Sequence, residues 1–259
     1  MHCHTLVVEE LTQINVQLWA DLALCRFKGT AFVCAGDFGQ FAPICEHWCG
    51  CSVPDSSLEQ SDMLFEMCGG HRLTLTENMR SDARLFEAYT DLGTDVQLAV
   101  ERCRALFPVT ERRARYTLTI SHRNRIHINR LRNVQDAPGW DGIYLKAPKE
   151  TGRGGNQPQD MILWKGLQLI GAGHRCLKGL FYEVEEVNEE VVRLTNGLVL
   201  THEQAVQSLR LCYALTYASC QGLTLPGLVR LDTKTEHFTL KHLYVGLSRA
   251  TAADLVEVC

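Results

Sequence analysis

Short apolar runs alternate with amphipathic segments along most of this 259-residue chain, and the alternation limits the folds it can adopt. Residues 5–8 (TLVV), 31–35 (AFVCA) and 116–121 (YTLTIS) are rich in β-branched and aromatic residues, as strands are. Residues 9–27 carry apolar side chains three or four positions apart, which is helical spacing: Leu11, Ile14, Leu18 and Leu22. Strands that alternate with helices predict an α/β fold with parallel sheets.

Three more helices and one more strand are expected in the first half of the chain. Residues 81–92 and 94–106 have helical spacing and open with Ser-Asp or Thr-Asp, which is a cap signal. Residues 121–133 (SHRNRIHINRLRN) follow an expected strand and indicate a further helix. Residues 72–75 (RLTL) have the composition of a strand.

The middle of the chain has a different texture. Residues 147–160 (APKETGRGGNQPQD) are rich in glycine, proline and polar residues, which indicates a loop or linker. Between residues 161 and 205 the strand-like runs are short and closely spaced, and Asn196-Gly197 has the composition of a hairpin turn. We therefore expect a small β-barrel inserted between α/β elements.

Composition excludes several classes of protein. Apolar residues make up 46% of the chain and charged residues 22%, as in soluble globular proteins. No run approaches the roughly 20 apolar residues of a membrane-spanning helix, and the first ten residues do not resemble a secretory signal. We expect an intracellular protein, whether nuclear, mitochondrial or cytoplasmic. Most of the twelve cysteines lie singly in apolar segments, which favours reduced thiols.

Two of the expected strands end in groups that suit phosphate chemistry. Glu9 and Glu10 come directly after the first apolar run, and Gly36, Asp37 and Gln40 come after the second. Because the carboxyl ends of parallel strands share one edge of a sheet, we expect these groups to lie close together. Carboxylates that hold Mg²⁺ or accept a proton from water, beside an amide that senses a terminal phosphate, would serve nucleotide hydrolysis.

An ordered set of motifs resembles those of superfamily 1 DNA helicases of the Pif and RecD type, and it covers nearly the whole chain. Motifs II to VI of that family resemble, in order, residues 7–10 (VVEE), 36–44 (GDFGQFAPI), 75–80 (LTENMR), 215–225 (LTYASCQGLTL) and 244–250 (YVGLSRA). The resemblance implies an ATP-dependent enzyme that moves 5′-to-3′ on single-stranded DNA.

The resemblance also implies a domain organisation. Residues 1–95 would form a partial first RecA-like domain, with motifs II, III and IV. Residues 96–160 and 206–259 would form a complete second RecA-like domain, with motifs V and VI. Residues 161–205 would be an SH3-like β-barrel inserted into that second domain.

Five residues acquire catalytic roles from the resemblance. Glu9 would hold Mg²⁺ through water, and Glu10 would be the general base for the attacking water. Gln40 would contact the γ-phosphate of ATP or that water. Arg80 and Arg249 would be arginine fingers, which neutralise charge in the transition state.

The remaining candidates would bind the nucleotide or the DNA strand. Near the nucleotide phosphates the resemblance implies Gly36, Asp37, Gln221 and Gly222. As contacts to single-stranded DNA it implies Thr216, His122, Arg123 and Arg125. The last three lie in the segment 101–132, which holds nine arginines and only two acidic residues and is therefore expected to form a local basic surface.

The chain departs from the family pattern in three places. It contains no G-x-x-x-x-G-K-[ST] phosphate-binding loop, and only eight residues precede Glu9. We therefore expect the C-terminal part of a helicase, inactive or weak by itself, with a missing N-terminal segment that carries the loop. Glu9 stands where motif II usually has aspartate. Motif V has Ala218, Ser219 and Cys220 instead of His-Lys-Ser, so a basic contact is absent.

Two other functions remain open at this stage. The chain could be a non-catalytic remnant that binds single-stranded DNA, which the missing phosphate loop favours. It could also be a zinc-binding interaction module, because several potential ligands are close in sequence: Cys45, His47, Cys49, Cys51, Cys68 and His71. Their spacing is not that of two regular C-x-x-C pairs, so a cysteine-rich surface loop is the alternative.

Overall fold

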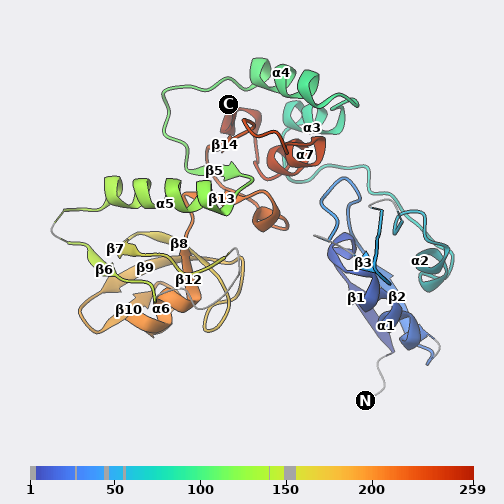
Figure 1. The fold of residues 1–259 in the computed structure, drawn as a ribbon, viewed down its shortest axis with the longest axis horizontal. Coiled ribbons are helices and arrows are strands. Elements are labelled where there is room, and N and C mark those ends of the chain that lie inside the picture. Colours follow the sequence, from blue (N-terminus) through green and yellow to red (C-terminus); the bar gives the residue numbers. More distant parts are fainter. Residues whose placement is uncertain (1–3, 27, 44–46, 55–56, 140, 149–155) are drawn as a thin grey trace. The chain divides into compact units, whose positions relative to one another are not determined.

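A computed structural model describes most of the chain: residues 4–26, 28–43, 47–54, 57–139, 141–148 and 156–259. The chain forms two compact units, Met1–Arg80 and Ser81–Cys259, whose elements are labelled in Figure 1. No helix in the described ranges is long and apolar enough to cross a membrane.

Unit 1 is built on two parallel strands, with Thr5 paired to Ala31 and Val8 to Cys34. Its core consists of Val8, Leu11, Trp19, Phe32 and Met67, so one face of the sheet is buried. The elements of the unit are β1 (Thr5–Val8), η1 (Leu11–Gln13), α1 (Val16–Arg26), β2 (Ala31–Cys34), β3 (His47–Trp48), β4 (Cys51–Ser52) and α2 (Asp62–Met67).

The helix expected from residue 9 starts later, at Val16. The carbonyl oxygen of the Asn15 side chain accepts a hydrogen bond from the backbone N–H of Leu18 at 2.8 Å, which caps the helix and fixes its start near Val16. Trp19 is then the buried residue of α1, whereas Leu18 is 46% exposed. Leu11, Ile14 and Leu22 belong to or pack against the core of unit 1, so the predicted apolar spacing fails only at Leu18.

The strand predicted at residues 72–75 does not form. Residues 71–79 have no regular structure, and Leu73 and Leu75 are 91% and 94% exposed. A strand needs a hydrogen-bonded neighbour, and none of the described strands pairs with this segment. The prediction was wrong because composition alone cannot supply that neighbour.

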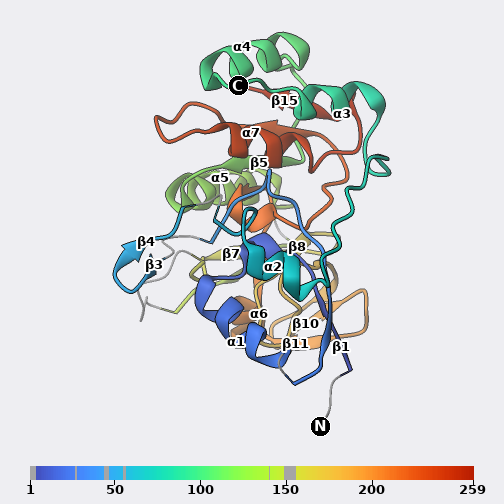
Figure 2. The same cartoon turned by 90° about the vertical axis from the view of Figure 1, so that its right-hand side faces the viewer.

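Unit 2 contains a four-stranded parallel sheet in the order β13-β5-β14-β15. The helix α5 packs against β5 and β13, whereas α7 contacts β14 and α4 contacts β15. In Figure 2 the helices α3, α4 and α7 lie above β5, and α5 lies below it. The elements are α3 (Ala83–Thr90), α4 (Val96–Leu106), β5 (Tyr116–Thr119), α5 (His122–Asp136), β13 (Ala214–Thr216), η2 (Ala218–Cys220), β14 (Val229–Leu231), α7 (Leu240–Leu247), η3 (Ala253–Leu255) and β15 (Val256–Val258).

A curled antiparallel sheet in the order β11-β10-β9-β8-β12 lies beside α5 in the same unit (Figure 1). It encloses a core of its own, which includes Leu163, Leu169, Val184 and Leu194. The elements are β6 (Ile143–Leu145), β7 (Met161–Leu163), β8 (Gln168–Gly171), β9 (Phe181–Val187), β10 (Val191–Leu194), β11 (Val199–Thr201), α6 (His202–Ser208) and β12 (Leu209–Leu211).

Local signals in the sequence fix several of these boundaries. The side chains of Asp82, Asp95 and Ser121 each accept a hydrogen bond from the backbone N–H three residues later, so they cap α3, α4 and α5. The caps of α3 and α4 were predicted. Asn196 and Gly197, with φ of 85° at the glycine, turn β10 into β11. The helices and the hairpin are confirmed. Of the predicted loop at residues 147–160, residues 149–155 lie outside the described ranges.

Candidate functional site

The ends of β1 and β2 meet, as the sequence predicts. The N–H of Ala35 donates to the carbonyl of Val8 at 2.8 Å, and the N–H of Leu11 donates to the carbonyl of Ala35 at 3.0 Å. A Cβ added to Gly36 would lie 2.6 Å from Cγ of Leu11, so only glycine allows this approach. The segment after the acidic doublet is thereby packed against the segment that leads to Asp37.

Glu10 has a strained backbone at this junction. Its φ and ψ are 52° and 42°, in the left-handed region that residues other than glycine seldom adopt. Its side chain accepts a hydrogen bond from Nε2 of Gln13 at 3.3 Å, while Glu9 is exposed. Neither carboxylate takes part in an ion pair among the described residues.

Gln40 is held by Asp37 in one orientation. Asp37 accepts from the N–H of Gly39 at 2.9 Å with one oxygen and from Nε2 of Gln40 at 3.2 Å with the other. Because an ionised carboxylate only accepts hydrogen bonds, the amide nitrogen of Gln40 must face Asp37. The amide oxygen of Gln40 is then left buried with no partner in the described chain. Gln40 is 8% exposed and offers an acceptor, not a donor, to whatever lies next to it.

This edge carries carboxylates of the kind that magnesium prefers. Mg²⁺ prefers oxygen ligands and usually takes one or two carboxylates while it keeps several waters. Glu9, Glu10 and Asp37 supply such oxygens from two adjoining strand ends. In the described ranges, no three or more His, Cys, Asp or Glu side chains gather in a way that could hold a metal ion, so Mg²⁺ binding at this edge stays a prediction. Water or phosphate would have to complete the coordination sphere.

Arg249 lies inside unit 2, where it joins the segments resembling motifs V and VI. It is 2% exposed and follows α7. Its guanidinium donates to the carbonyls of Val245 at 3.2 Å and Leu223 at 3.3 Å and to Oγ of Ser248 at 2.9 Å. The backbone N–H of Leu225 donates to the carbonyl of Arg249 at 2.9 Å. A conformational change in residues 221–225 would therefore alter the hydrogen bonds of Arg249 directly.

Residues 216–222 form a tight turn after β13. The N–H and hydroxyl of Thr216 both contact Oγ of Ser219, at 3.0 and 2.9 Å, and Thr216 is 4% exposed. Gly222 has φ of 75°, which favours glycine. Nε2 of Gln221 is buried with no acceptor in the part of the chain that the structure describes. The serine that replaces a family lysine in motif V thus holds the turn together.

The other DNA-binding candidates begin α5, at the same edge of the sheet. The N–H of Tyr217, next to Thr216, donates to the carbonyl of Thr119 at 3.0 Å, which brings this edge close to the start of α5. Arg123 is exposed there. His122 is half-buried, and burial together with the charge of Arg125 lowers the pKa of its imidazole. Arg125 lies in the interior at 3% exposure.

Arg80 ends unit 1 after the exposed segment 71–79, and its N–H donates to the side chain of Asn78 at 3.1 Å. Its proposed partners at β1 and β2 are in the same unit. Arg249 belongs to the other unit. The roles of Arg80 and Arg249 as arginine fingers therefore stay predictions.

The basic surface expected from residues 101–132 is largely occupied by contacts within unit 2. Arg132, for example, lies over the ring of Tyr213 at 5.1 Å and donates to the carbonyl of Ala114 at 3.0 Å. Other partners are Asp91 for Arg102, Thr233 for Arg104, the Asp254 carbonyl for Arg112, Asp136 for Arg113 and Gln168 for Arg115. Most of these partners are neutral, and Arg102, Arg104, Arg112, Arg113 and Arg115 remain exposed, so the local basic surface stays a prediction.

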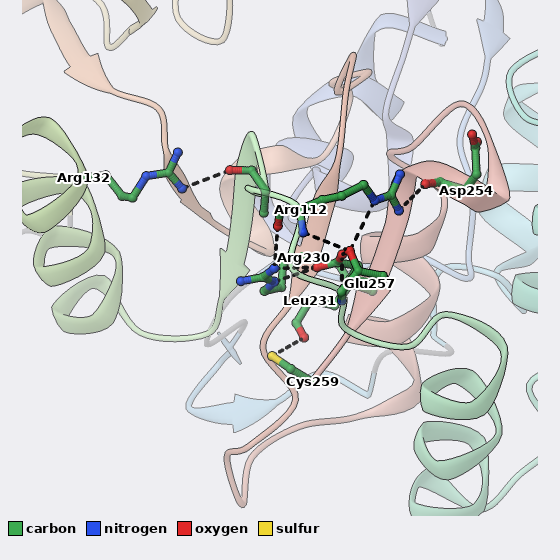
Figure 3. A network of polar contacts seen from close by, with 9 residues as sticks. Arg112, Arg132, Arg230, Leu231, Asp254, Glu257 and Cys259 are labelled. Carbon is green, nitrogen blue, oxygen red and sulfur yellow. Dashed lines mark hydrogen bonds and ion pairs between the residues drawn. The ribbon is translucent and has the colours of Figure 1, made fainter. Parts of the chain in front are cut away.

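The sequence reading missed Glu257, which organises the network in Figure 3. This carboxylate is fully buried on β15 and accepts from Nε and Nη2 of Arg230, at 2.9 and 2.6 Å. The N–H of Thr110 adds a third hydrogen bond at 3.1 Å. Burial raises the pKa of Glu257, but these hydrogen bonds outweigh burial and leave it below its ordinary value. A charged residue within the apolar run LVEV was the only sequence signal.

The potential zinc ligands do not gather in the described chain. Cys45 lies outside the described ranges, while Cys49 and Cys51 are exposed at a two-strand turn. Cys68 instead lies against Cys34, and burial together with a hydrogen bond from the Cys34 thiol to Cys68 raises the pKa of Cys34 to about 12.

Three solved structures show what this architecture is similar to. The Pif1 helicase from Candida albicans aligns with a TM-score of 0.68 and 18% identity over 98% of this chain and 71% of that chain. The chain has the fold of the Pif1 helicases. Bacteroides Pif1 bound to single-stranded DNA aligns with a TM-score of 0.64 and 14% identity, over 98% of this chain and 70% of that one. Bacteroides Pif1 in complex with ADP-AlF3 and single-stranded DNA gives the same values.

Sequence comparison alone does not reach this result. No family model matches the chain, and no curated protein matches it. The identity to the Pif1 structures is low enough that the likeness concerns the fold, and function has to be argued from residues.

Proposed function

We propose that this chain is the nucleotide- and DNA-responsive part of a Pif1-type motor, which couples ATP hydrolysis to 5′-to-3′ movement on single-stranded DNA. The observation that carries the proposal is the pair Asp37–Gln40 beside Glu10. An amide oxygen that is buried, oriented and without a donor suits a water molecule about to attack a phosphate, because that water needs acceptors for its protons.

Each residue at this edge has a defined task in the proposal. Glu9 would hold Mg²⁺ through water, Glu10 would accept the proton of the attacking water, and Gln40 would orient that water through its amide oxygen. Bound Mg²⁺ would supply charge neutralisation at the phosphates. Glutamate in place of the usual aspartate at Glu9 lengthens the reach by one methylene, which changes where the hydrated ion lies.

Residues of unit 2 would link the nucleotide to the DNA strand. Gln221 and Gly222 would respond to the phosphates, and their neighbours Leu223 and Leu225 contact Arg249. To act as an arginine finger, Arg249 would exchange its 3.3 Å hydrogen bond to the carbonyl of Leu223 for one to a phosphate oxygen. Arg80 would be the second finger.

The domain limits proposed with this function follow the family pattern. Residues 1–95 would be the partial first RecA-like domain, and residues 96–160 with 206–259 the second. Residues 161–205 would be the SH3-like insertion. Thr216, His122 and Arg123 would contact single-stranded DNA at the carboxyl edge of the second sheet, where the ligands of parallel sheets bind.

The experiment measures DNA binding and ATP turnover on the chain as it stands. We expect a fluorescent oligo-dT to bind with an affinity that falls as salt rises, because phosphate contacts release counterions. We expect ATP to bind no more tightly than about 1 mM, because the sequence has no phosphate loop. If single-stranded DNA does not bind at all, the proposal is wrong.

Where turnover is measurable, Glu10→Gln tests the proposed base. The change should lower the rate by roughly 10²–10⁴-fold while nucleotide binding is retained, because only the proton acceptor is lost. Glu59→Gln is the control, because Glu59 is an exposed carboxylate of the same unit that pairs with Arg72. Equal rates in wild type and Glu10→Gln would remove Glu10 from the role.

A second candidate function is a non-catalytic module that binds single-stranded DNA. The lack of a phosphate loop in the sequence favours it, and it predicts DNA binding without any DNA-stimulated turnover. A zinc module is the third candidate, and it would require Cys45 to complete a site with Cys49 and Cys51. Metal analysis of the purified chain distinguishes the zinc module from the other two candidates, since a structural site needs about one zinc per chain.

A further inference from the structure

Two buried guanidinium groups lie together in unit 2, in a region to which the proposed motor assigns no common role. Arg125 is in the first turn of α5 and Arg210 is on β12, and they are 3% and 6% exposed. Both contact Asn156. Nη1 of Arg125 donates to the side-chain oxygen of Asn156 at 2.9 Å, and Nε and Nη2 of Arg210 donate to its carbonyl at 3.3 and 3.1 Å.

Neither cation has a counterion in the described chain. Each of the ion pairs found in the described ranges involves other residues. Burial lowers the pKa of Arg125, and burial together with the charge of Arg125 lowers the pKa of Arg210 to about 10. Both remain protonated at neutral pH, because arginine keeps its proton in proteins. Unit 2 therefore buries two like charges next to each other.

The two arginines differ in how well their N–H groups are satisfied. Arg210 donates to the carbonyls of Val206, Gln207 and Leu209 at 2.7–3.1 Å, in addition to Asn156. Arg125 has only its contact to Asn156, and its Nε and Nη2 are buried with no partner. Burying unmatched donors of a charged group is costly, so native structures rarely keep them without a ligand.

The unmatched edge of Arg125 has the shape of an oxyanion site. Nε and Nη2 of one guanidinium form the planar fork that binds two oxygens of a phosphate or carboxylate. The start of α5 adds partial positive charge, because the first N–H groups of a helix point outward. Nδ1 of His122, one position into the same helix, is also buried without a partner. Two full charges and a helix N-terminus favour phosphate over a singly charged carboxylate.

We propose that Arg125, with Arg210 and Asn156 behind it, binds a phosphate group. Nε and Nη2 of Arg125 take two of its oxygens, and Arg210 contributes charge while its own donors stay on backbone carbonyls. The phosphate could be a free anion or a phosphodiester of single-stranded DNA. The free-anion case is independent of the proposed motor, whereas the phosphodiester case rests on its DNA binding.

Thermal unfolding of the full chain tests the site, with sodium phosphate as the probe at constant ionic strength set by NaCl. We expect the Tm of the wild type to rise by roughly 5 °C at saturating phosphate, because a ligand that binds only the folded state stabilises it. Arg125→Gln should abolish this rise. Arg130→Gln is the matched control, because Arg130 is an exposed arginine on the same helix, and it should keep the rise.

Asn156→Asp gives a second test that does not remove either arginine. A carboxylate at the position that already contacts both guanidinium groups supplies a built-in counterion. We expect a higher Tm than wild type without phosphate and little further rise with it. If Arg125→Gln does not fold, this variant still decides the matter. A lower Tm combined with an undiminished phosphate response would overturn the proposal.

Fluorescence anisotropy with oligo-dT identifies the source of the phosphate. A tenfold weaker affinity in Arg125→Gln, with a salt dependence reduced by about one contact, assigns the site to the DNA backbone. Unchanged DNA affinity with a lost phosphate response assigns it to a free anion. If Arg125→Gln changes neither the phosphate response nor the DNA affinity, the site does not exist. Loss of DNA binding in all variants and wild type would contradict the motor but not the free-anion site.

Discussion

The two parallel sheets carry polar groups at their carboxyl edges, but they support those groups differently. In unit 2 the strand residues Tyr116, Leu118 and Leu231 are completely buried, because helices cover both faces. In unit 1 the sheet has two strands, and Val7 and Val33 on one face are 62% and 55% exposed. Parallel strands are usually buried on both faces. The edge with Glu10 and Gln40 is therefore held by fewer contacts than the edge with Thr216.

The two units are therefore stabilised by different kinds of contact. Unit 2 is held by long-range packing and by a buried ion pair between β14 and β15, Arg230–Glu257. Unit 1 relies on short-range features, namely the approach of Leu11 to Gly36 and the hydrogen bonds around Asp37. Substitutions should consequently have larger effects on stability in unit 2, and more local effects in unit 1.

The largest effect is expected at Glu257. Glu257→Gln leaves Arg230 without its counterion and should lower the free energy of unfolding by about 3 kcal/mol, as removal of one partner from a buried pair does. Glu186→Gln is the matched control, because its side chain is 62% exposed in a strand pair with Arg193, and such pairs contribute less than about 1 kcal/mol. Chemical denaturation of both variants measures the difference, and similar losses would contradict the comparison.

The contribution of Glu257 to stability should also depend on pH. The pKa of Glu257 is lower in the folded chain than its ordinary value of 4.5. The folded state therefore gains stability from the ionised carboxylate above pH 4.5 and loses it as the pH falls through the folded pKa. The advantage of the wild type over Glu257→Gln should shrink below pH 4.5 and stay constant between pH 5 and 7.

A smaller effect, at milder pH, is expected from His242 in α7. Burial against Tyr217 and Phe238 lowers the pKa of its imidazole from 6.5 to about 4. The unfolded chain then binds a proton that the folded chain does not, so stability falls as the pH drops from 6.5 toward 4. Between pH 6.5 and 5 the loss should be about 2 kcal/mol, since one pH step corresponds to 1.36 kcal/mol.

His242→Gln should remove this acid sensitivity. Glutamine can keep the reciprocal hydrogen bond that His242 makes with Thr239 at the start of α7, because it is a common residue at that position of a capping box. Denaturation curves at pH 6.5 and 5 for both proteins check the expectation. A wild type as stable at pH 5 as at pH 6.5 would show that the imidazole is not held neutral.

Sequence patterns predicted what depends on neighbours along the chain and missed what depends on packing. The caps at Asp82, Asp95 and Ser121 and the turn at Asn196 were predictable because each needs only nearby residues. The ends of β1 and β2 were predictable because parallel strands share an edge. The exposed segment 71–79 was not, because nothing local shows whether a strand finds a neighbour.

The buried polar residues of unit 2 could not be predicted from the sequence either. Arg125, Asn156 and Arg210 are separated by 31 and 54 residues, and only the fold brings them together. Arg125 was assigned to a DNA contact by motif resemblance, whereas the structure has it buried. Charge counting treated the arginines of residues 101–132 alike, although most have partners and Arg125 keeps an unmatched edge.

Within unit 1, Gly36→Ala should have the next largest effect. The added methyl would lie 2.6 Å from Cγ of Leu11, so the two strand ends must separate. Overpacking of this kind costs about 1–3 kcal/mol. Gly139→Ala is the control, because a Cβ at Gly139 meets no atom within 4 Å. Hydrogen exchange at the N–H of Leu11, which bonds to Ala35, reports the opening, and equal exchange in both variants would contradict it.

The smallest change in stability, with the clearest local consequence, is expected for Asp37→Asn. The asparagine keeps an oxygen for the N–H of Gly39 but presents an amide nitrogen to Gln40. The side-chain amide of Gln40 should then flip, so that its oxygen faces residue 37. The buried atom without a partner would then be the nitrogen, which is a donor. We expect the free energy of unfolding to fall by no more than about 1 kcal/mol, since one hydrogen bond replaces another. The side-chain amide NMR signals of Gln40 report this flip, because the amide nitrogen loses its hydrogen bond to residue 37 and gains no other acceptor. If the signals match those of the wild type, the orientation of Gln40 does not depend on Asp37, and the proposed role of its oxygen toward water loses its structural basis.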